Sequence, residues 1–142
     1  EKLTDYIRTG INVDAILTSQ LLINIFEHNT PLHDGAVIVR ENRIVAATCY
    51  LPLSDNMELS KQLGTRHRAG VGISEQTDSV TIIVSEETGQ VSVAQNGRLI
   101  RGVSSAKLRE ILVRAQNKQV VDNSKLRHLL KGRMKHEEEK TH

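Results

Sequence analysis

The sequence has few cysteines and few aromatic residues, the residue types on which disulfide-rich proteins and many nucleic-acid-binding proteins depend. It has one cysteine, Cys49, and no tryptophan among its 142 residues. One cysteine cannot form a disulfide within the chain, which is typical of a reducing compartment. The aromatic residues are limited to Tyr6, Phe26 and Tyr50. Because so few rings offer stacking platforms for bases, no nucleic-acid partner is expected.

Long apolar runs are also missing. None reaches the roughly 20 residues that a membrane-spanning helix needs, and the first residues lack the apolar segment of a signal peptide. The chain as given is therefore expected to be soluble. With 38% hydrophobic residues it can form a real core, at a length typical of one domain. The glycine-rich patterns of P-loop and dinucleotide-binding proteins are absent, as are metal-binding Cys/His clusters, which excludes those classes.

Charge is distributed unevenly along the chain. Residues 1–97 carry 7 Lys and Arg against 12 Asp and Glu, a net charge of −5, while residues 98–142 carry 12 against 5, a net charge of +7. A basic C-terminal segment could bind nucleic acid or an anionic membrane surface. The simpler interpretation is a solvated helix face. Binding that weakens with salt would identify a nucleic-acid-binding module.

Apolar patterning predicts an α/β domain over about residues 3–120 and a basic helical or frayed tail over 121–142. Residues 1–10 are interpreted as a helix fragment or linker. A helix capped by Ser19 is expected to bury a stripe of Leu22, Ile23 and Phe26. Continuous apolar character suggests that both faces of the first strand pair are covered, and Asn96-Gly97 predicts a tight hairpin. Strands are predicted at 36–39, 44–51, 80–85, 90–95 and 98–101, and further helices at 68–73, after 104–105 and from 122.

The first candidate site is the string Leu32-His33-Asp34-Gly35-Ala36, directly before an apolar strand. Asp34 would lie at a sheet edge, where α/β proteins commonly bind ligands. His33 could join it in holding a divalent cation, and Gly35 would let a ligand approach the backbone. Two alternatives stay open: Asp34 as the cap of a turn, and His33 as a hydrogen-bonded structural residue.

The second candidate site is the string Gly64-Thr65-Arg66-His67-Arg68-Ala69-Gly70, which is predicted to open a helix. Free N–H groups at a helix start favour phosphate, and guanidinium groups form charge-assisted hydrogen bonds with it. Because consecutive helical residues point about 100° apart, Arg66, His67 and Arg68 cannot all share one face. With Thr65 as the cap, this turn would suit a triphosphate; the alternative is an exposed basic turn.

Two further segments carry weaker signals. In the polar turn Ser85-Glu86-Glu87-Thr88-Gly89, Glu87 could supply another hard oxygen to a cation, although a plain hairpin turn also explains the segment. Tyr50-Leu51-Pro52-Leu53 ends a strand with an aromatic ring and with backbone groups left free by proline. An adenine could stack and hydrogen-bond there, or Tyr50 could simply pack at the strand end.

The pair of strings Asp34-Gly35-Ala36 and Arg66-His67-Arg68 resembles the signature of the diadenylate cyclase (DAC) domain, which condenses two ATP molecules into cyclic di-AMP. Residues 21–26, 29–38, 49–54 and 84–89 resemble the membrane-anchored CdaA-type subfamily. The resemblance covers roughly residues 3–115. It implies the DAC-domain fold, in which a central mixed β-sheet is flanked by helices.

The resemblance also implies a role for each matching residue. The aspartate of the family's Asp-Gly-Ala string serves the metal and the attacking 3′-hydroxyl, and here it is Asp34. The implied catalytic residues are Asp34, Arg66, His67 and Arg68; the implied ATP-binding residues are Gly35, Ala36, Tyr50, Leu51, Gly64, Thr65 and Ser85; the implied metal ligands are His33, Asp34 and Glu87.

From the same resemblance we expect a divalent metal, Mn²⁺ or Mg²⁺ with Co²⁺ as a further option, and a homodimer that meets face to face for catalysis. A regulatory membrane protein and phosphoglucosamine mutase are the expected partners, and the full-length bacterial protein is expected at the cytoplasmic face of the cell membrane. The family's membrane anchor and the opening helix and strand of its domain are missing from this sequence, so a truncated domain is expected. The alternative function is a non-catalytic sensor of adenine nucleotides or cyclic dinucleotides. Retention of Asp34 and both arginines favours the enzyme.

Overall fold

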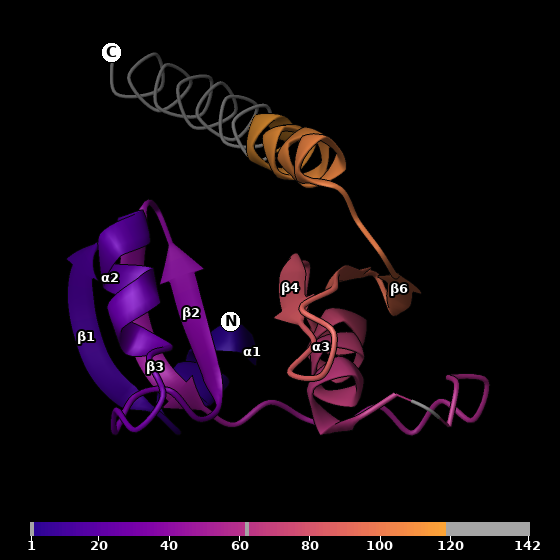
Figure 1. The fold of residues 1–142 in the computed structure, drawn as a ribbon, viewed down its shortest axis with the longest axis horizontal. Helices are drawn as coiled ribbons and strands as arrows, with labels where there is room; N and C mark the ends of the chain where they lie inside the picture. The colour runs from indigo at the N-terminus through magenta and orange to yellow at the C-terminus, as the bar shows by residue number, and fades with distance from the viewer. Residues whose placement is uncertain (1, 62, 119–142) are drawn as a thin grey trace, which may run out of the picture. The chain divides into compact units, whose positions relative to one another are not determined.

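The structure is a computed structural model that describes residues 2–61 and 63–118. By its internal contacts the chain divides into two units, Glu1–Arg101 and Gly102–His142. The first unit contains all the strands and three helices of the described part (Figure 1). These elements are α1 (Lys2–Ile7), β1 (Ile11–Ile16), α2 (Ser19–Ile25), β2 (Ala36–Arg40), β3 (Arg43–Cys49), α3 (Thr65–Gln76), β4 (Thr81–Val84), β5 (Val91–Gln95) and β6 (Arg98–Ile100).

The first three strands form an antiparallel sheet in the order β1-β3-β2. A tight turn joins β2 to β3, because Arg40 pairs with Arg43 and both intervening residues, Glu41 and Asn42, have positive φ. β1 was not predicted. Its residues Ile11 to Ala15 alternate apolar and polar side chains, a strand signal that was missed.

Helices cover both faces of this sheet, as its continuous apolar sequence predicted. On one face, Ile7 of α1 packs with Ile38, Ala46 and Cys49. On the other, Ile25 of α2 packs with Ile44 and Ala47. Figure 1 shows α2 lying against the strands.

The N-cap of α2 lies one residue earlier than predicted. Thr18, not Ser19, is the N-cap: its side chain accepts a hydrogen bond from the N–H of Leu21 at 3.1 Å. The predicted stripe was correspondingly wrong at two positions, because Ile23 is 62% and Phe26 50% exposed. Leu21, Leu22 and Ile25 face the sheet instead.

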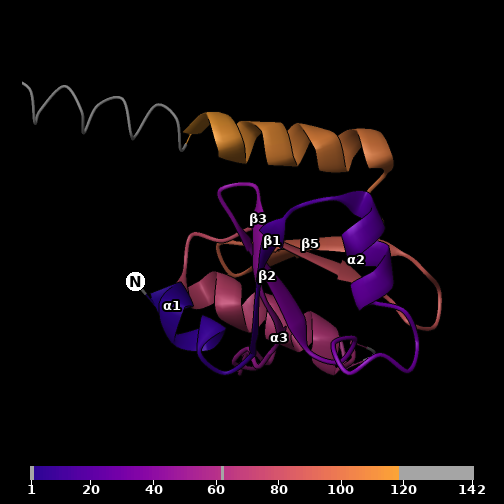
Figure 2. The same ribbon diagram turned by 90° about the vertical axis from the view of Figure 1, so that its left-hand side faces the viewer.

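The last three strands form a second antiparallel sheet in the order β4-β5-β6, on which α3 packs. Figure 2 labels β5 of this sheet and α3. The predicted Asn96-Gly97 hairpin is confirmed, since both residues have positive φ between the paired Gln95 and Arg98. Val71 of α3 is buried with residues of β4 and β5. The α/β class is thus confirmed, with the strands of the described residues arranged as two antiparallel sheets in place of one mixed sheet.

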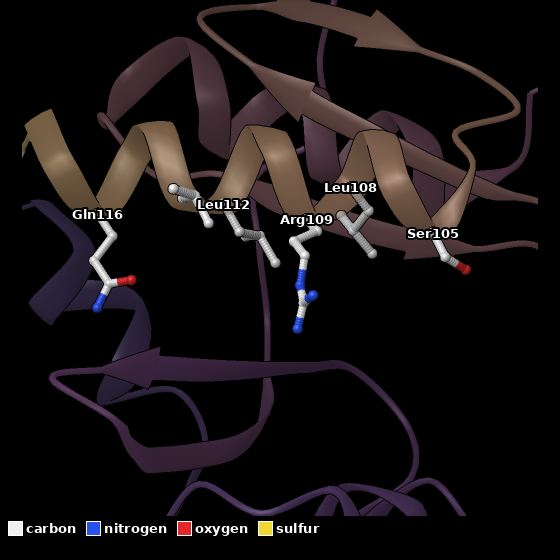
Figure 3. A pocket seen from close by; sticks show the side chains of 6 residues that line it. Ser105, Leu108, Arg109, Leu112 and Gln116 are labelled. Carbon is white, nitrogen blue, oxygen red and sulfur yellow. The ribbon is translucent and has the colours of Figure 1, made fainter.

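The second unit contains the predicted helix after Ser104, over residues 105–118. The Ser104 hydroxyl caps it by accepting from the N–H of Lys107 at 3.1 Å. Figure 3 shows Leu108, Leu112 and Arg109 along this helix. Within residues 2–61 and 63–118, no helix has the length and apolarity to cross a bilayer. The predicted tail, 121–142, lies outside the described residues.

Candidate nucleotide site

The Asp34-Gly35-Ala36 string forms the entry to β2. Asp34 is exposed. Gly35 has a φ of +92°, a backbone conformation that residues other than glycine rarely adopt. A Cβ at Gly35 would lie 2.9 Å from the backbone carbon atoms of Thr48. Glycine is therefore needed at position 35 both for the turn and for the close approach of β3. Asp34 lies directly before this turn, at the start of β2.

His33 is held in one orientation by its neighbours. Its Nδ1 lies 2.7 Å from the carbonyl oxygen of Thr30. Because a carbonyl only accepts, the proton of this hydrogen bond is on Nδ1, and in the neutral ring Nε2 has a lone pair. A second ring, His28, lies 5.8 Å away between centroids. Such anchoring of one ring nitrogen is the arrangement that orients a histidine toward a metal ion.

The predicted metal ligands do not form a closed cluster. Among the residues that the structure describes, no group of three His, Cys, Asp or Glu side chains is close enough to hold a metal ion. His33 and Asp34 are adjacent in the chain, whereas Glu87 is exposed in the turn after β4. A cation here would need further oxygen ligands from a substrate. The assignment of His33, Asp34 and Glu87 as metal ligands stays a prediction.

The second string forms the N-terminus of α3, with a cap that differs from the expected one. Gly64 is the N-cap and Thr65 is the first helical residue, so the prediction of Thr65 as cap was wrong. Gly64 has no side chain that could accept a hydrogen bond from the N–H groups of the first turn. The Gly64 carbonyl oxygen accepts a hydrogen bond from the N–H of Arg68, four residues later. The N–H groups before it point along the helix axis, where an anion would bind.

The Arg66 guanidinium joins α3 to the end of β4. Its Nη1 donates to the carbonyl oxygen of Val84 at 3.2 Å, and its Nη2 donates to the Glu86 carboxylate. Arg66 therefore lies beside the predicted Ser85 segment. Sequence reasoning singled out Glu87 and missed Glu86 as the acid that contacts the arginine.

Ser85 serves the turn itself. Its Oγ accepts from the N–H of Thr88 at 3.3 Å, and its carbonyl accepts from Gly89 at 2.9 Å. The plain turn interpretation is thus correct for the backbone. It leaves open the predicted contact of Ser85 with a nucleotide.

His67 lies in a strongly positive environment. Burial lowers the pKa of its imidazole, and the charges of Arg101 and Arg66 lower it further. Sequence reasoning missed Arg101, which lies directly after β6, because its proximity to α3 results from long-range packing. His67 is therefore favoured in its neutral form until an anion offsets these cations.

Arg68 connects the string to the predicted adenine segment. Its carbonyl oxygen accepts from the N–H of Ser54 at 2.9 Å. Arg68 is half-buried, and its guanidinium has no hydrogen-bond or ion-pair partner among residues 2–61 and 63–118. Of the two arginines, Arg66 is thus engaged by Val84 and Glu86, whereas the Arg68 guanidinium has no such partner among the described residues.

The predicted adenine segment follows β3. The Tyr50 residue is 74% exposed, so it does not pack at the strand end, and its N–H donates to Thr9 Oγ1 at 2.9 Å. Leu51 beside it is half-buried. An exposed ring on a backbone that is fixed in place is suited to stack on a flat ligand.

Comparisons with known proteins agree with this geometry. Residues 1–99 match the family described as "DAC: DisA bacterial checkpoint controller nucleotide-binding". The chain is 59% identical over 129 residues to "Cyclic di-AMP synthase CdaA" of Bacillus subtilis, covering 91% of this chain and 47% of that protein. It is 62% identical over 110 residues to "Diadenylate cyclase" of Listeria monocytogenes, covering 78% of this chain and 40% of that protein.

A solved structure shares the fold. The crystal structure of DacA from Staphylococcus aureus, as an N166C/T172C double mutant, matches with a TM-score of 0.77 at 53% identity, over 80% of this chain and 75% of that one. The chain spans less than half the length of the two curated relatives above. The family match extends over more than half of this chain and includes both strings of the candidate site. The chain therefore belongs to the DAC family of nucleotide-binding domains.

Proposed function

We propose that this domain is a diadenylate cyclase, which condenses two ATP molecules into cyclic di-AMP and releases two pyrophosphates. The observation that carries the proposal is the identity of 59–62% to a cyclic di-AMP synthase and a diadenylate cyclase, with Asp34 and both arginines of the two strings in place. A sensor could lose the acid and still bind phosphate, whereas synthesis of the product requires a group that activates a hydroxyl.

In the proposed complex, the N-terminus of α3 binds the triphosphate. The N–H groups of its first turn, Arg68 and the nearby Arg101 supply positive charge, and Arg66 can exchange its contact with Glu86 for a phosphate oxygen. Positively charged groups beside the phosphates stabilise the negative charge of the transition state of phosphoryl transfer. Tyr50 and Leu51 would contact the adenine, and Ser85 with Gly35, Ala36, Gly64 and Thr65 would line the nucleotide.

Asp34 is proposed to orient the 3′-hydroxyl and to accept its proton as the oxygen attacks the α-phosphate of the other ATP. The new bond joins the 3′-oxygen to the α-phosphorus, and the bond to the leaving pyrophosphate breaks. Exposure of Asp34 at the start of β2 leaves its carboxylate accessible to a substrate.

His33 and Asp34 would hold the expected divalent ion, Mn²⁺, Mg²⁺ or Co²⁺, through an imidazole nitrogen and a carboxylate. Glu87 is a further proposed ligand. When bound, such an ion neutralises charge on the phosphates and the leaving pyrophosphate.

The reaction also requires two copies of the domain. One chain carries one Asp34 and one arginine string, whereas the product joins two adenylates through two equivalent bonds. A two-fold interface that places two sites face to face lets each 3′-hydroxyl attack the opposite nucleotide. The regulatory membrane protein, phosphoglucosamine mutase and attachment of the full-length protein to the membrane stay predictions from the resemblance.

The proposal is tested by a matched pair of variants, Asp34→Asn and Asp78→Asn. Both replace an exposed aspartate by its neutral isostere, and Asp78 lies two residues after α3. Each protein is incubated with ATP and Mn²⁺ or Mg²⁺, and the nucleotides are separated by chromatography. We expect cyclic di-AMP from the unmodified chain and from Asp78→Asn, and none from Asp34→Asn. Equal product from both variants would refute the role of Asp34; ATP binding without product in the unmodified chain would favour a sensor.

A further inference from the structure

The segment from Tyr50 to Ser54 is fixed at both ends by residues far away in the sequence. At its start, the Tyr50 N–H donates to Thr9 Oγ1 at 2.9 Å. At its end, the Ser54 N–H donates to the Arg68 carbonyl oxygen at 2.9 Å. The segment therefore connects the exposed ring of the proposed adenine site directly to a residue of the proposed phosphate helix.

Ser54 is the more strongly connected end. It is only 5% exposed, and its hydroxyl donates to the Glu75 carboxylate on α3. The same hydroxyl accepts from the N–H of Asn56 at 3.2 Å. A hydroxyl that both donates and accepts has a defined orientation, and a hydrogen bond to a carboxylate is stronger than one between neutral groups. Glu75 thus fixes Ser54 against α3.

The segment and the helix are also in direct backbone contact. A Cβ at Gly72 would overlap the carbonyl oxygen of Pro52 and would lie 2.9 Å from the Ser54 nitrogen. Gly72 and Glu75 are three residues apart on α3 and so share one side of the helix. The glycine permits the close approach, and the hydrogen bond from Ser54 to Glu75 keeps the segment from sliding along the helix.

We infer that Ser54 and Glu75 are positioning residues for the nucleotide, which set the distance between the adenine-binding segment and the phosphate-binding end of α3. The inference rests on the proposed function. ATP has its base and triphosphate at a limited separation, so a shift of one binding element against the other weakens binding of the whole molecule. Misplacement by about 1 Å can reduce the rate by about 100-fold. Neither Ser54 nor Glu75 contacts ATP in this account; they act through Tyr50, Leu51 and Arg68.

The test compares Ser54→Ala, Glu75→Ala and Glu75→Gln with the matched control Ser79→Ala. Ser79 also forms a side-chain hydrogen bond, to Thr77 Oγ1 at 2.7 Å, but beyond the end of α3. We expect Ser54→Ala and Glu75→Ala to raise the KM for ATP about tenfold, because the adenine-binding segment is no longer held at the separation from α3 that ATP requires. Glu75→Gln keeps an accepting oxygen and should stay within about twofold of the unmodified chain, as should Ser79→Ala.

A second readout separates positioning from general stability. The preference for ATP over GTP, as a ratio of kcat/KM values, should fall in Ser54→Ala and Glu75→Ala, because a displaced segment recognises adenine less well. The double variant should be no worse than Ser54→Ala, since Ser54→Ala already lacks the hydrogen bond to Glu75. Thermal unfolding identifies any variant that does not fold; Glu75 is exposed, so Glu75→Ala keeps the test available if Ser54→Ala is unfolded.

Unchanged KM and unchanged nucleotide preference in folded Glu75→Ala would overturn the inference. So would a Glu75→Gln variant as impaired as Glu75→Ala, because the hydrogen bond would then not be the cause. Calorimetric binding of ATP is measured alongside turnover. If the unmodified chain forms no cyclic di-AMP, the proposed function fails, while the ATP affinities of the variants still decide the positioning role.

Discussion

Replacing Gly35 by alanine tests the turn that presents Asp34. Gly35 has a φ of +92°, and an added Cβ would lie 2.9 Å from backbone atoms of Thr48 and 3.1 Å from the Cys49 carbonyl oxygen. Two effects therefore act together, a strained backbone and a contact with atoms that cannot rotate away. The glycines at 64 and 89 allow these effects to be separated.

The magnitudes follow from the three environments. Gly89 has a φ of +70° with nothing within 4 Å of an added Cβ, so its replacement should destabilise by about 1–2 kcal/mol from the backbone alone. Gly64 has a φ of −79° and open space, so Gly64→Ala should change stability by less than about 1 kcal/mol. Gly35→Ala adds crowding of about 1–3 kcal/mol to the backbone strain, for a total of about 2–5 kcal/mol.

The assay is urea unfolding of the three variants and the unmodified chain, followed by circular dichroism, with the free energy of unfolding extrapolated to water. The order of destabilisation should be Gly35→Ala, then Gly89→Ala, then Gly64→Ala. If Gly35→Ala destabilises no more than Gly89→Ala, Thr48 does not crowd Gly35 and the reasoning about this turn is refuted.

Three further predictions follow from the site and its core. Arg66→Ala or Arg68→Ala should weaken ATP binding by about 1.5–3 kcal/mol per lost charged hydrogen bond. Arg68→Ala should have the larger effect, because Arg66 also bonds Val84 and Glu86. Unchanged ATP affinity in both variants would show that the Arg66-His67-Arg68 string is only an exposed turn. The pKa of His67 is lowered by burial and by Arg101 and Arg66. The contribution of neutral His67 to stability is therefore present above the unfolded pKa of about 6.5 and is lost as pH falls through the folded pKa. His67→Gln should make the urea midpoint depend less on pH between 7 and 5, and an identical pH dependence would contradict this. Specific activity should rise with protein concentration until the proposed dimer saturates, and it should not stay constant on dilution to a concentration where sedimentation detects only monomer.

Local chemistry made several parts of the fold predictable. Asn96-Gly97 identified its hairpin because both turn positions require positive φ, which these residues tolerate. Apolar runs over β2 and β3 correctly predicted a sheet covered on both faces. The cap of α2 was misplaced because Thr18 and Ser19 are both good capping residues, and only the backbone geometry distinguishes them.

Features that depend on long-range packing were not predictable. β1 is an exception, because its residues alternate apolar and polar side chains from Ile11 to Ala15, a local strand signal that was missed. Nothing in the strand sequences specifies their division into two antiparallel sheets. In the site, the choice of Glu86 over Glu87 as partner of Arg66 depends on the shape of the turn, and Arg101 approaches His67 only through the packing of α3 on the second sheet.

The most direct test of the central claim is the stoichiometry of the reaction with ATP. The unmodified chain is incubated with ATP and Mn²⁺, cyclic di-AMP is quantified by chromatography, and pyrophosphate is quantified enzymatically in the same samples. The proposed chemistry predicts two pyrophosphates for each cyclic di-AMP, with both products absent in Asp34→Asn. Release of phosphate in place of pyrophosphate, or a ratio of two to one that persists in Asp34→Asn, would contradict it.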